Sequence, residues 1–229
     1  MRDWWYGDKR DIVKWGAILV LAREKSINTV LQVALYRPDR KKEYKLAVNG
    51  TPKDLLPNEV IRHFRDINKV KELVAMVAST QLRIDVHKDL FQKQKGCKLR
   101  TQEKFRKDYF DKVAKKIKEY GDAVIVFLDP DTGIAPKTYS YNHVTCKEIQ
   151  KILRAMKRGD VLLFYQHAWL GNADWRNLTK KKFVEAVGPT VPVNTITCEN
   201  IAHDVAFFVV ERSEWVDDPP EESKPDGAA

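Results

Sequence analysis

The segment 123–136, A-V-I-V-F-L-D-P-D-T-G-I-A-P, constrains the fold more than any other part of this chain. Six apolar residues without polar alternation are typical of a strand buried on both faces of a parallel sheet. Pro130 cannot donate a ladder hydrogen bond, so the chain should leave the sheet there in a stiff turn, with Gly133 free to take a positive φ. Parallel α/β sheets bind ligands at the carboxyl ends of their strands. We therefore expect Asp129 and Asp131 at the chemically active edge, the alternative being a plain Asx-type turn.

The rest of the chain alternates between helical and strand patterns, which predicts one α/β domain over residues 1–212. The five residues between the last two strands are too few for a crossover, so these strands should form an antiparallel hairpin. A mostly parallel, Rossmann-like sheet that ends in such a hairpin resembles the layout of Rossmann-like methyltransferases. The expected helices are 8–23, 57–78 (one or two), 101–120, 145–156 and 176–187, and the expected strands are 29–36, 82–86, 123–128, 160–165, 194–198 and 204–211.

Charge divides the chain into a basic body and an acidic end. The whole chain carries +9, whereas residues 213–229 hold six acidic residues and one lysine, so residues 1–212 carry +14. The densest basic stretch is 88–118, with twelve Lys or Arg against four acidic residues. Such a patch is typical of nucleic-acid binding, although a solvated helix face has the same composition. The acidic end, rich in proline, should be disordered.

The cysteine content and the apolar runs indicate a cytoplasmic protein. Cys97, Cys146 and Cys198 are odd in number and too widely spaced to form a metal-ligand pair, which fits a reducing compartment. Charged residues interrupt the N-terminal segment, so we expect no secretory signal. No apolar run is long enough to span a membrane.

A second group of polar residues, Y-Q-H-A-W-L-G-N-A-D-W, follows the strand 160–165. If that strand neighbours the strand 123–128, Gln166 and His167 converge with Asp129 and Asp131 at one edge. Two acids and a histidine suit general acid–base chemistry or a divalent metal. A histidine that merely ends a strand is the alternative, with the following tryptophans as packing residues.

A third group, W-W-Y-G-D-K-R-D-I-V-K-W at residues 4–15, interleaves aromatic and basic residues. Such residues can stack on bases and contact phosphates. Alternatively, Asp8 is a helix N-cap and the tryptophans cover the sheet edge.

The first and third groups together resemble adenine-N6 methyltransferases that act on large-subunit ribosomal RNA. Those enzymes carry G-N-x-x-D-x-x-K-H before the cofactor strand and D-P-P-Y at the target base. Here Gly7, Asp11 and Lys14 match the first motif, Asp8 and Trp15 replace its asparagine and histidine, and Asp129 with Pro130 matches the second. The strings F-L-D-P-D-T-G and Y-Q-H also resemble a poorly characterised family of bacteria and phages.

The chain departs from these methyltransferases at two places. It has no glycine between the first strand and Gly50, where they have a glycine-rich turn, and Asp131-Thr132 replaces Pro-Tyr. The same scaffold could therefore serve metal-assisted phosphodiester or nucleotide chemistry.

The sequence thus predicts a methyltransferase-like enzyme that acts on nucleic acid or a nucleotide and uses S-adenosylmethionine. A nuclease or phosphodiesterase with a divalent metal, and a non-catalytic domain that binds nucleic acid or a partner, are the alternatives. The expected catalytic residues are Asp129, Asp131, Gln166 and His167, and the resemblance implies cofactor binding by Asp8, Asp11, Lys14 and Pro130.

Overall fold

The computed structural model describes residues 8–35, 82–87, 89–91, 99–139, 141–168 and 173–213. The helices expected in 57–78, the residues Trp4 to Gly7 and the acidic segment from 214 lie outside the described residues.

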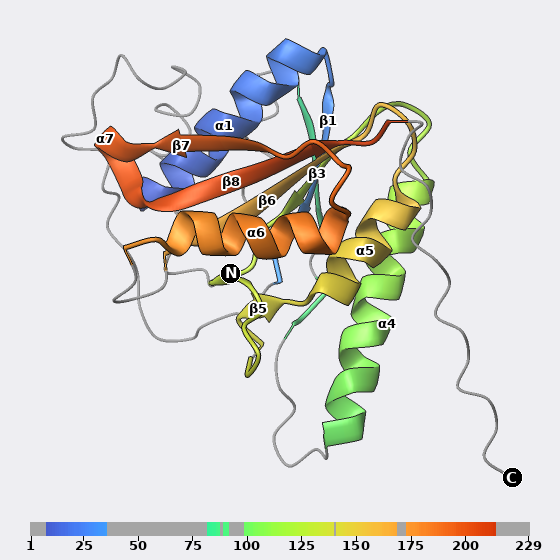
Figure 1. The fold of residues 1–229 in the computed structure, drawn as a ribbon. Helices are drawn as coiled ribbons and strands as arrows, with labels where there is room; N and C mark the ends of the chain where they lie inside the picture. The colour runs from blue at the N-terminus through green and yellow to red at the C-terminus, as the bar shows by residue number, and fades with distance from the viewer. Residues whose placement is uncertain are drawn as a thin grey trace, which may run out of the picture.

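A six-stranded sheet in the order β2-β1-β3-β6-β8-β7 forms the centre of the molecule (Figure 1). The first four strands in that order are parallel, and β8 runs antiparallel to both β6 and β7. This confirms the predicted Rossmann-like sheet and its hairpin, and it meets the condition that the two polar-ended strands, β3 and β6, are neighbours. The strand bounds are β1 Thr29–Val33, β2 Arg83–His87, β3 Ile125–Leu128, β6 Val161–His167, β7 Asn194–Cys198 and β8 His203–Glu211.

Helices cover both faces of this sheet and explain the unbroken apolar run of β3. Ile125 and Phe127 pack beneath α1 (Lys9–Lys25), whereas Val126 and Leu128 pack against the helices of the other face. Successive side chains of a strand point to opposite faces, so a doubly covered strand has no polar position. The short α7 (Glu199–Ala202) lies beside α1, and the other face carries α4 (Leu99–Lys118), α5 (Cys146–Ala155) and α6 (Trp175–Val187).

Local signals in the sequence set the ends of two helices. The Asp8 side chain accepts hydrogen bonds from the backbone N–H groups of Arg10 and Asp11, so it is the N-cap of α1. Thr145 and Glu148 form a reciprocal capping box at the start of α5. Both ends follow from residues within four positions of the cap.

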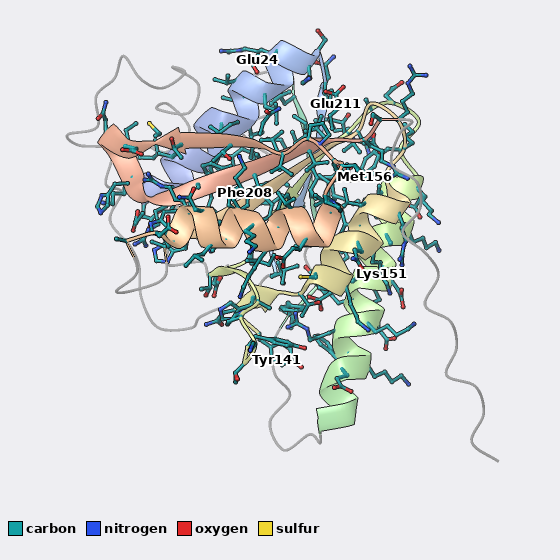
Figure 2. The ribbon with its side chains drawn as sticks, viewed as in Figure 1. Glu24, Tyr141, Lys151, Met156, Phe208 and Glu211 are labelled. Carbon is teal, nitrogen blue, oxygen red and sulfur yellow. The ribbon has the colours of Figure 1, made fainter. Side chains whose placement is uncertain are left out.

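The helices of the second face are tied to one another by charged side chains. Arg106 of α4 is buried and donates two hydrogen bonds, of 2.8 and 2.7 Å, to the Glu148 carboxylate of α5. Lys151 of α5 reaches toward α4 (Figure 2), where it pairs with Asp111.

No helix among the residues described here is both long enough and apolar enough to cross a membrane.

Trp15 lies in the core rather than on a surface that could stack on bases. It is fully buried in α1 and meets Phe127 edge-on, with ring centroids 6.3 Å apart. Trp175 is likewise buried, at the first position of α6. These two tryptophans are packing residues.

Candidate active site at the carboxyl edge of the sheet

Four polar side chains lie on the α1 face at the carboxyl ends of β1, β3 and β6. Val30, Phe127 and Leu163 pack in the cluster beneath α1, and side chains two positions further along a strand share the same face. This rule places the following residues there: Gln32, Asp129, Tyr165 and His167. The backbone N–H of Asp129 still donates to the carbonyl of Val33, at 3.0 Å, so Asp129 keeps the register of the sheet.

A buried lysine forms the centre of this group. The Lys14 ammonium lies 2.9 Å from Asp11 Oδ1 and 2.9 Å from Asp129 Oδ1, and 4.2 Å from the centroid of the Tyr165 ring. The side chains of Lys14 and of the three residues around it are all buried, and Asp129 is 1% exposed. We call Asp11, Lys14, Asp129 and Tyr165 the Lys14 centre. Gln32 Nε2 donates to Asp129 Oδ2 at 3.2 Å, so both oxygens of this carboxylate are held in place.

Burial and the neighbouring charges act in opposite directions on these groups. Burial disfavours the charged form of Lys14, but the carboxylates of Asp11 and Asp129 outweigh it and raise the lysine pKa. Burial raises the pKa of Asp11 to about 7, with Lys14 offsetting part of the effect. Burial also raises the pKa of Tyr165. The phenol is therefore neutral at physiological pH, and the lysine is charged.

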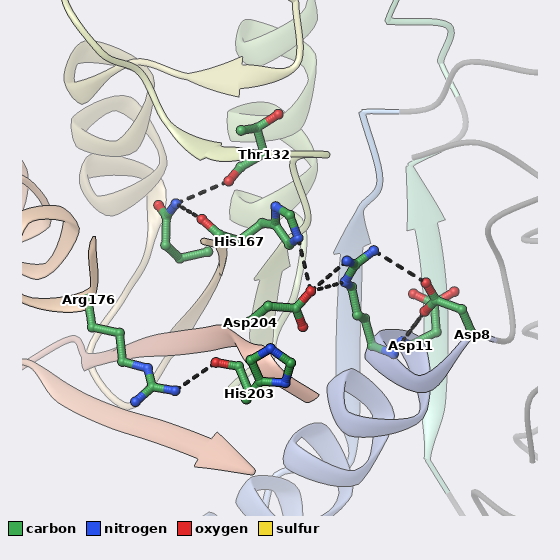
Figure 3. Close-up of polar contacts among 9 residues, drawn as sticks. Asp8, Asp11, Thr132, His167, Arg176, His203 and Asp204 are labelled. Carbon is green, nitrogen blue, oxygen red and sulfur yellow. Dashed lines mark hydrogen bonds and ion pairs between the residues drawn. The ribbon is translucent and has the colours of Figure 1, made fainter. Parts of the chain in front are cut away.

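Beside the Lys14 centre lies a second group, which we call the Asp204 group and which consists of Arg10, His167 and Asp204. Arg10 donates from Nε and Nη2 to Asp204 Oδ2 at 3.0 and 2.5 Å, and His167 Nε2 lies 3.3 Å from the same oxygen (Figure 3). Arg10 Nη1 also lies 3.7 Å from Asp8 Oδ2. Because β8 runs antiparallel to β6, the first residues of β8 reach the carboxyl edge of β6.

Arg10 and Asp204 are functional candidates that the sequence did not indicate. Arg10 belongs to a helix start, and Asp204 lies 194 residues later along the chain. The hairpin prediction held a usable signal for Asp204, because the first residue of an antiparallel strand lies at the same edge as the last residues of its parallel neighbours. No local pattern indicated that Arg10 would be its partner.

The pKa of His167 moves opposite to the direction expected from nearby acids. Burial and then the charge of Arg10 lower it below the usual value of 6.5, and Asp204 offsets only part of this effect. Acids converging on His167, as expected from the sequence, would raise its pKa, but no sequence pattern indicated the Arg10 guanidinium beside the ring. At Asp204, burial is outweighed by the hydrogen bonds and charge of Arg10, which lower its pKa to about 2.

Gln166 lies on the opposite face from the Lys14 centre. Its Oε1 accepts from the Ile134 N–H at 2.9 Å, and its Nε2 donates to the carbonyls of Thr132 and His167 at 3.1 and 2.7 Å. These bonds use both amide hydrogens, so the side chain holds the loop after β3 against β6. Gln166 therefore does not converge with His167 as expected, because strand alternation places the two side chains on different faces.

The Asp-Pro-Asp turn leaves the sheet as the sequence predicted. Pro130 is buried next to Asp129, Asp131 is half-buried, and Gly133 has φ +122°. Gly133 begins the short strand β4 (Gly133–Ile134), which pairs with β5 (His143–Val144). The turn therefore brings its acidic residues to the edge where His167 lies, and the His167 N–H donates to the Thr132 carbonyl at 3.1 Å.

The turn after β1 uses a left-handed residue although it lacks the glycine of methyltransferases. Leu35 has φ +43° and is buried in the cluster that also contains Tyr109 of α4. A bulky residue takes this conformation only where its surroundings hold it. Packing around Leu35 thus holds a left-handed backbone conformation that glycine would adopt without strain.

The described part of the chain contains no group of three or more His, Cys, Asp or Glu side chains placed to hold a metal ion. Instead, Asp129 is paired with Lys14, and Asp204 with Arg10 and His167. The divalent metal expected from the acids and histidine therefore has no ligand set among these residues.

No protein-family model and no curated protein matches this chain. Among solved structures, it is similar to an O-methyltransferase family protein from Burkholderia thailandensis, with 13% sequence identity and a TM-score of 0.35. The alignment covers 91% of this chain and 61% of that protein, so this chain spans about three fifths of its length. The strand order and the hairpin themselves define the class, a Rossmann-like α/β fold with a methyltransferase-like sheet.

Asp11 should make stability fall as the pH rises. Its pKa is about 7 in the folded chain against 3.8 ordinarily, so between these values the folded state holds a proton that the unfolded state has released. The free energy of unfolding should then decrease by up to about 1 kcal/mol per pH unit from pH 4 to 7. Urea unfolding of the native chain and Asp11→Asn across this range measures the effect as their difference. A difference that stays constant with pH would contradict this role of Asp11. The control is Asp108→Asn, because Asp108 is an exposed residue of α4.

Gly133→Ala should displace the Gln166 side chain. A Cβ at residue 133 would lie 2.2 Å from Gln166 Oε1, and the φ of +122° is strained for alanine. We expect a loss of about 2–4 kcal/mol in the free energy of unfolding. Gly121→Ala is the matched control, because nothing lies within 4 Å of its Cβ position. Equal stabilities of the two variants would show that Gln166 does not hold the loop.

Proposed function

We propose that this chain is an S-adenosylmethionine-dependent, methyltransferase-like enzyme that acts on nucleic acid or a nucleotide. The observation that carries the proposal is the Lys14 centre, a buried lysine between two carboxylates at the carboxyl edge of a Rossmann-like sheet. Burying charges is costly even when they are paired, and clusters with strongly shifted pKa values are enriched at functional sites. This edge is also where such sheets bind their ligands.

The charged groups at this edge fit the chemistry of the cofactor. S-adenosylmethionine carries a carboxylate, an ammonium and a positively charged sulfur, and when bound it supplies a methyl group from that sulfur. Lys14 and Arg10 offer cations for a carboxylate, and the acidic side chains offer partners for the positive groups. By resemblance, Asp8, Asp11, Lys14 and Pro130 would hold the cofactor.

Asp129 is the residue best placed to orient the substrate. Lys14 and Gln32 fix its carboxylate, and the turn that follows carries Asp131 at the same edge. His167 is held next to this turn through the Thr132 carbonyl. We assign substrate orientation to Asp129, with Asp131 and His167 beside it.

The surface of α4 supports a nucleic-acid substrate. Lys104 and Lys115 are exposed, lie three helical turns apart on one face, and have no carboxylate partner among the described residues. The N-terminal half of α4 extends beyond the sheet on the side of β5 (Figure 1). A polyanion bound along α4 would therefore lead toward the edge that holds Asp129.

Asp129→Asn should abolish methyl transfer while the chain stays folded. Asp11 can ionise in place of Asp129, so Lys14 keeps a counter-charge in the variant. We expect turnover to fall by about a hundredfold or more, measured as transfer of a radiolabelled methyl group to RNA. Asp108→Asn is the control, and thermal unfolding checks the fold.

Calorimetry with S-adenosylmethionine, with and without Mg²⁺ or Mn²⁺, separates the alternatives. Binding without metal supports the proposal. Binding of the metal alone would support a hydrolase instead. Failure to bind either one, with RNA binding intact, would support a non-catalytic domain.

Removing charge from α4 should weaken RNA binding and its salt dependence. The double variant Lys104→Gln with Lys115→Gln should reduce the slope of log K against log salt by up to about 2, because each phosphate contact contributes about 0.9. Fluorescence anisotropy with a single-stranded RNA measures this slope. Lys180→Gln with Lys181→Gln on α6 removes the same charge and should leave the slope unchanged. Equal effects of the two double variants would show that α4 is merely a solvated face.

A further inference from the structure

We propose that Asp204 and Arg10 are positioning residues that hold His167 with its proton on Nε2, so that Nδ1 accepts the proton released by the substrate. The inference deepens the proposed function and rests on it, because it gives His167 a defined role in that reaction. It assigns roles to two residues at opposite ends of the described chain.

The hydrogen bonds at Asp204 determine which nitrogen of His167 carries the proton. An ionised carboxylate only accepts hydrogen bonds, so the 3.3 Å contact with Asp204 Oδ2 requires a hydrogen on Nε2 of the ring. Arg10 donates two further hydrogen bonds to the same oxygen, which fixes the carboxylate in front of the ring. A neutral imidazole with its proton on Nε2 has its free electron pair on Nδ1.

The backbone holds the imidazole from two sides and leaves it open to ligands. The His167 N–H donates to the Thr132 carbonyl at 3.1 Å, and the Ala168 N–H donates to the Asp204 carbonyl at 2.8 Å. The His167 side chain is 25% exposed. In Figure 3 the second ring nitrogen points away from Asp204, on the side of Thr132. The Thr132 carbonyl that accepts from the His167 N–H belongs to the turn that carries Asp131, so this turn lies next to His167.

The charges around His167 keep the ring neutral near pH 7. It faces Arg10 and Lys14 of α1 and Asp204 of β8. Burial and Arg10 lower its pKa, and Asp204 offsets only part of this. A neutral imidazole can accept a proton, whereas an imidazolium cannot.

The proton balance of the reaction requires such an acceptor. When a substrate N–H or O–H group is methylated, a bond forms from the methyl carbon to nitrogen or oxygen, and the methyl–sulfur bond breaks with its electron pair left on sulfur. The substrate proton then has to leave. It passes to Nδ1 of His167 and from there to solvent.

Nuclear magnetic resonance of the chain labelled with ¹⁵N-histidine reads the tautomer directly and needs no activity. We expect His167 in the native chain to show a protonated Nε2 and an unprotonated Nδ1 above pH 7. Asp204→Ala removes the acceptor and should give a mixture of tautomers. His203→Ala, at the exposed neighbouring histidine, is the control and should change nothing at His167. A native His167 protonated on Nδ1, or a tautomer that Asp204→Ala leaves unchanged, would overturn the proposal.

The pH profile of methyl transfer tests the same arrangement in a way that a purely structural role would not affect. Arg10 lowers the pKa of His167, so Arg10→Gln should move the acidic limb of kcat/KM to higher pH. Asp204 raises that pKa, so Asp204→Asn should move the limb to lower pH, and Asp204→Ala should lower kcat about 10- to 100-fold. Limbs that coincide in all variants would overturn the role of His167. A correct tautomer without any methyl transfer would instead count against the proposed function alone.

Discussion

The pairing of Lys14 with two carboxylates is the interaction on which the rest of this site depends. A buried ammonium requires a counter-charge, and Asp11 and Asp129 supply it from different elements, α1 and the end of β3. Removing one partner of a buried pair typically costs about 3–5 kcal/mol, because the other charge is left uncompensated. Here a second carboxylate is present, so the centre tolerates a proton on one of its acids. This pairing also holds the first two turns of α1 against the carboxyl edge of the sheet.

The two faces of the sheet contribute in different ways to that edge. On the α1 face, Asp129, Tyr165 and His167 carry the charged and titratable groups. On the other face, Gln166 uses its amide to hold the loop after β3, and Gly133 leaves room for it. Adjacent residues of β6 therefore differ in role: Gln166 holds the loop on one face, and His167 meets Asp204 on the other. A strand can do this because its side chains alternate between faces.

The site joins segments from the beginning, the middle and the end of the described chain. Arg10 belongs to the first helix and Asp204 to the last strand, and the same carboxylate oxygen also meets His167 at the end of β6. Asp8 caps α1 and lies near the Arg10 guanidinium. A site of this kind forms only when the hairpin has docked onto β6, so its geometry depends on the whole sheet. In this arrangement burial and the charge of Arg10 together outweigh the effect of Asp204 on the pKa of His167.

The sequence by itself predicted the main helices and strands of the described residues, the antiparallel hairpin and the turn at Asp129. Those features follow from periodicity, from the length of a connection and from the conformational limits of proline and glycine, all of which act over a few residues. Only the tertiary structure decided that Asp204 meets Arg10, that Gln166 supports a loop, and that the pKa of His167 is lowered. Each of these depends on which side chains meet across the sheet, and a step of one residue along a strand reverses the face. Electrostatic energies depend on those distances and on burial, which a linear pattern does not contain.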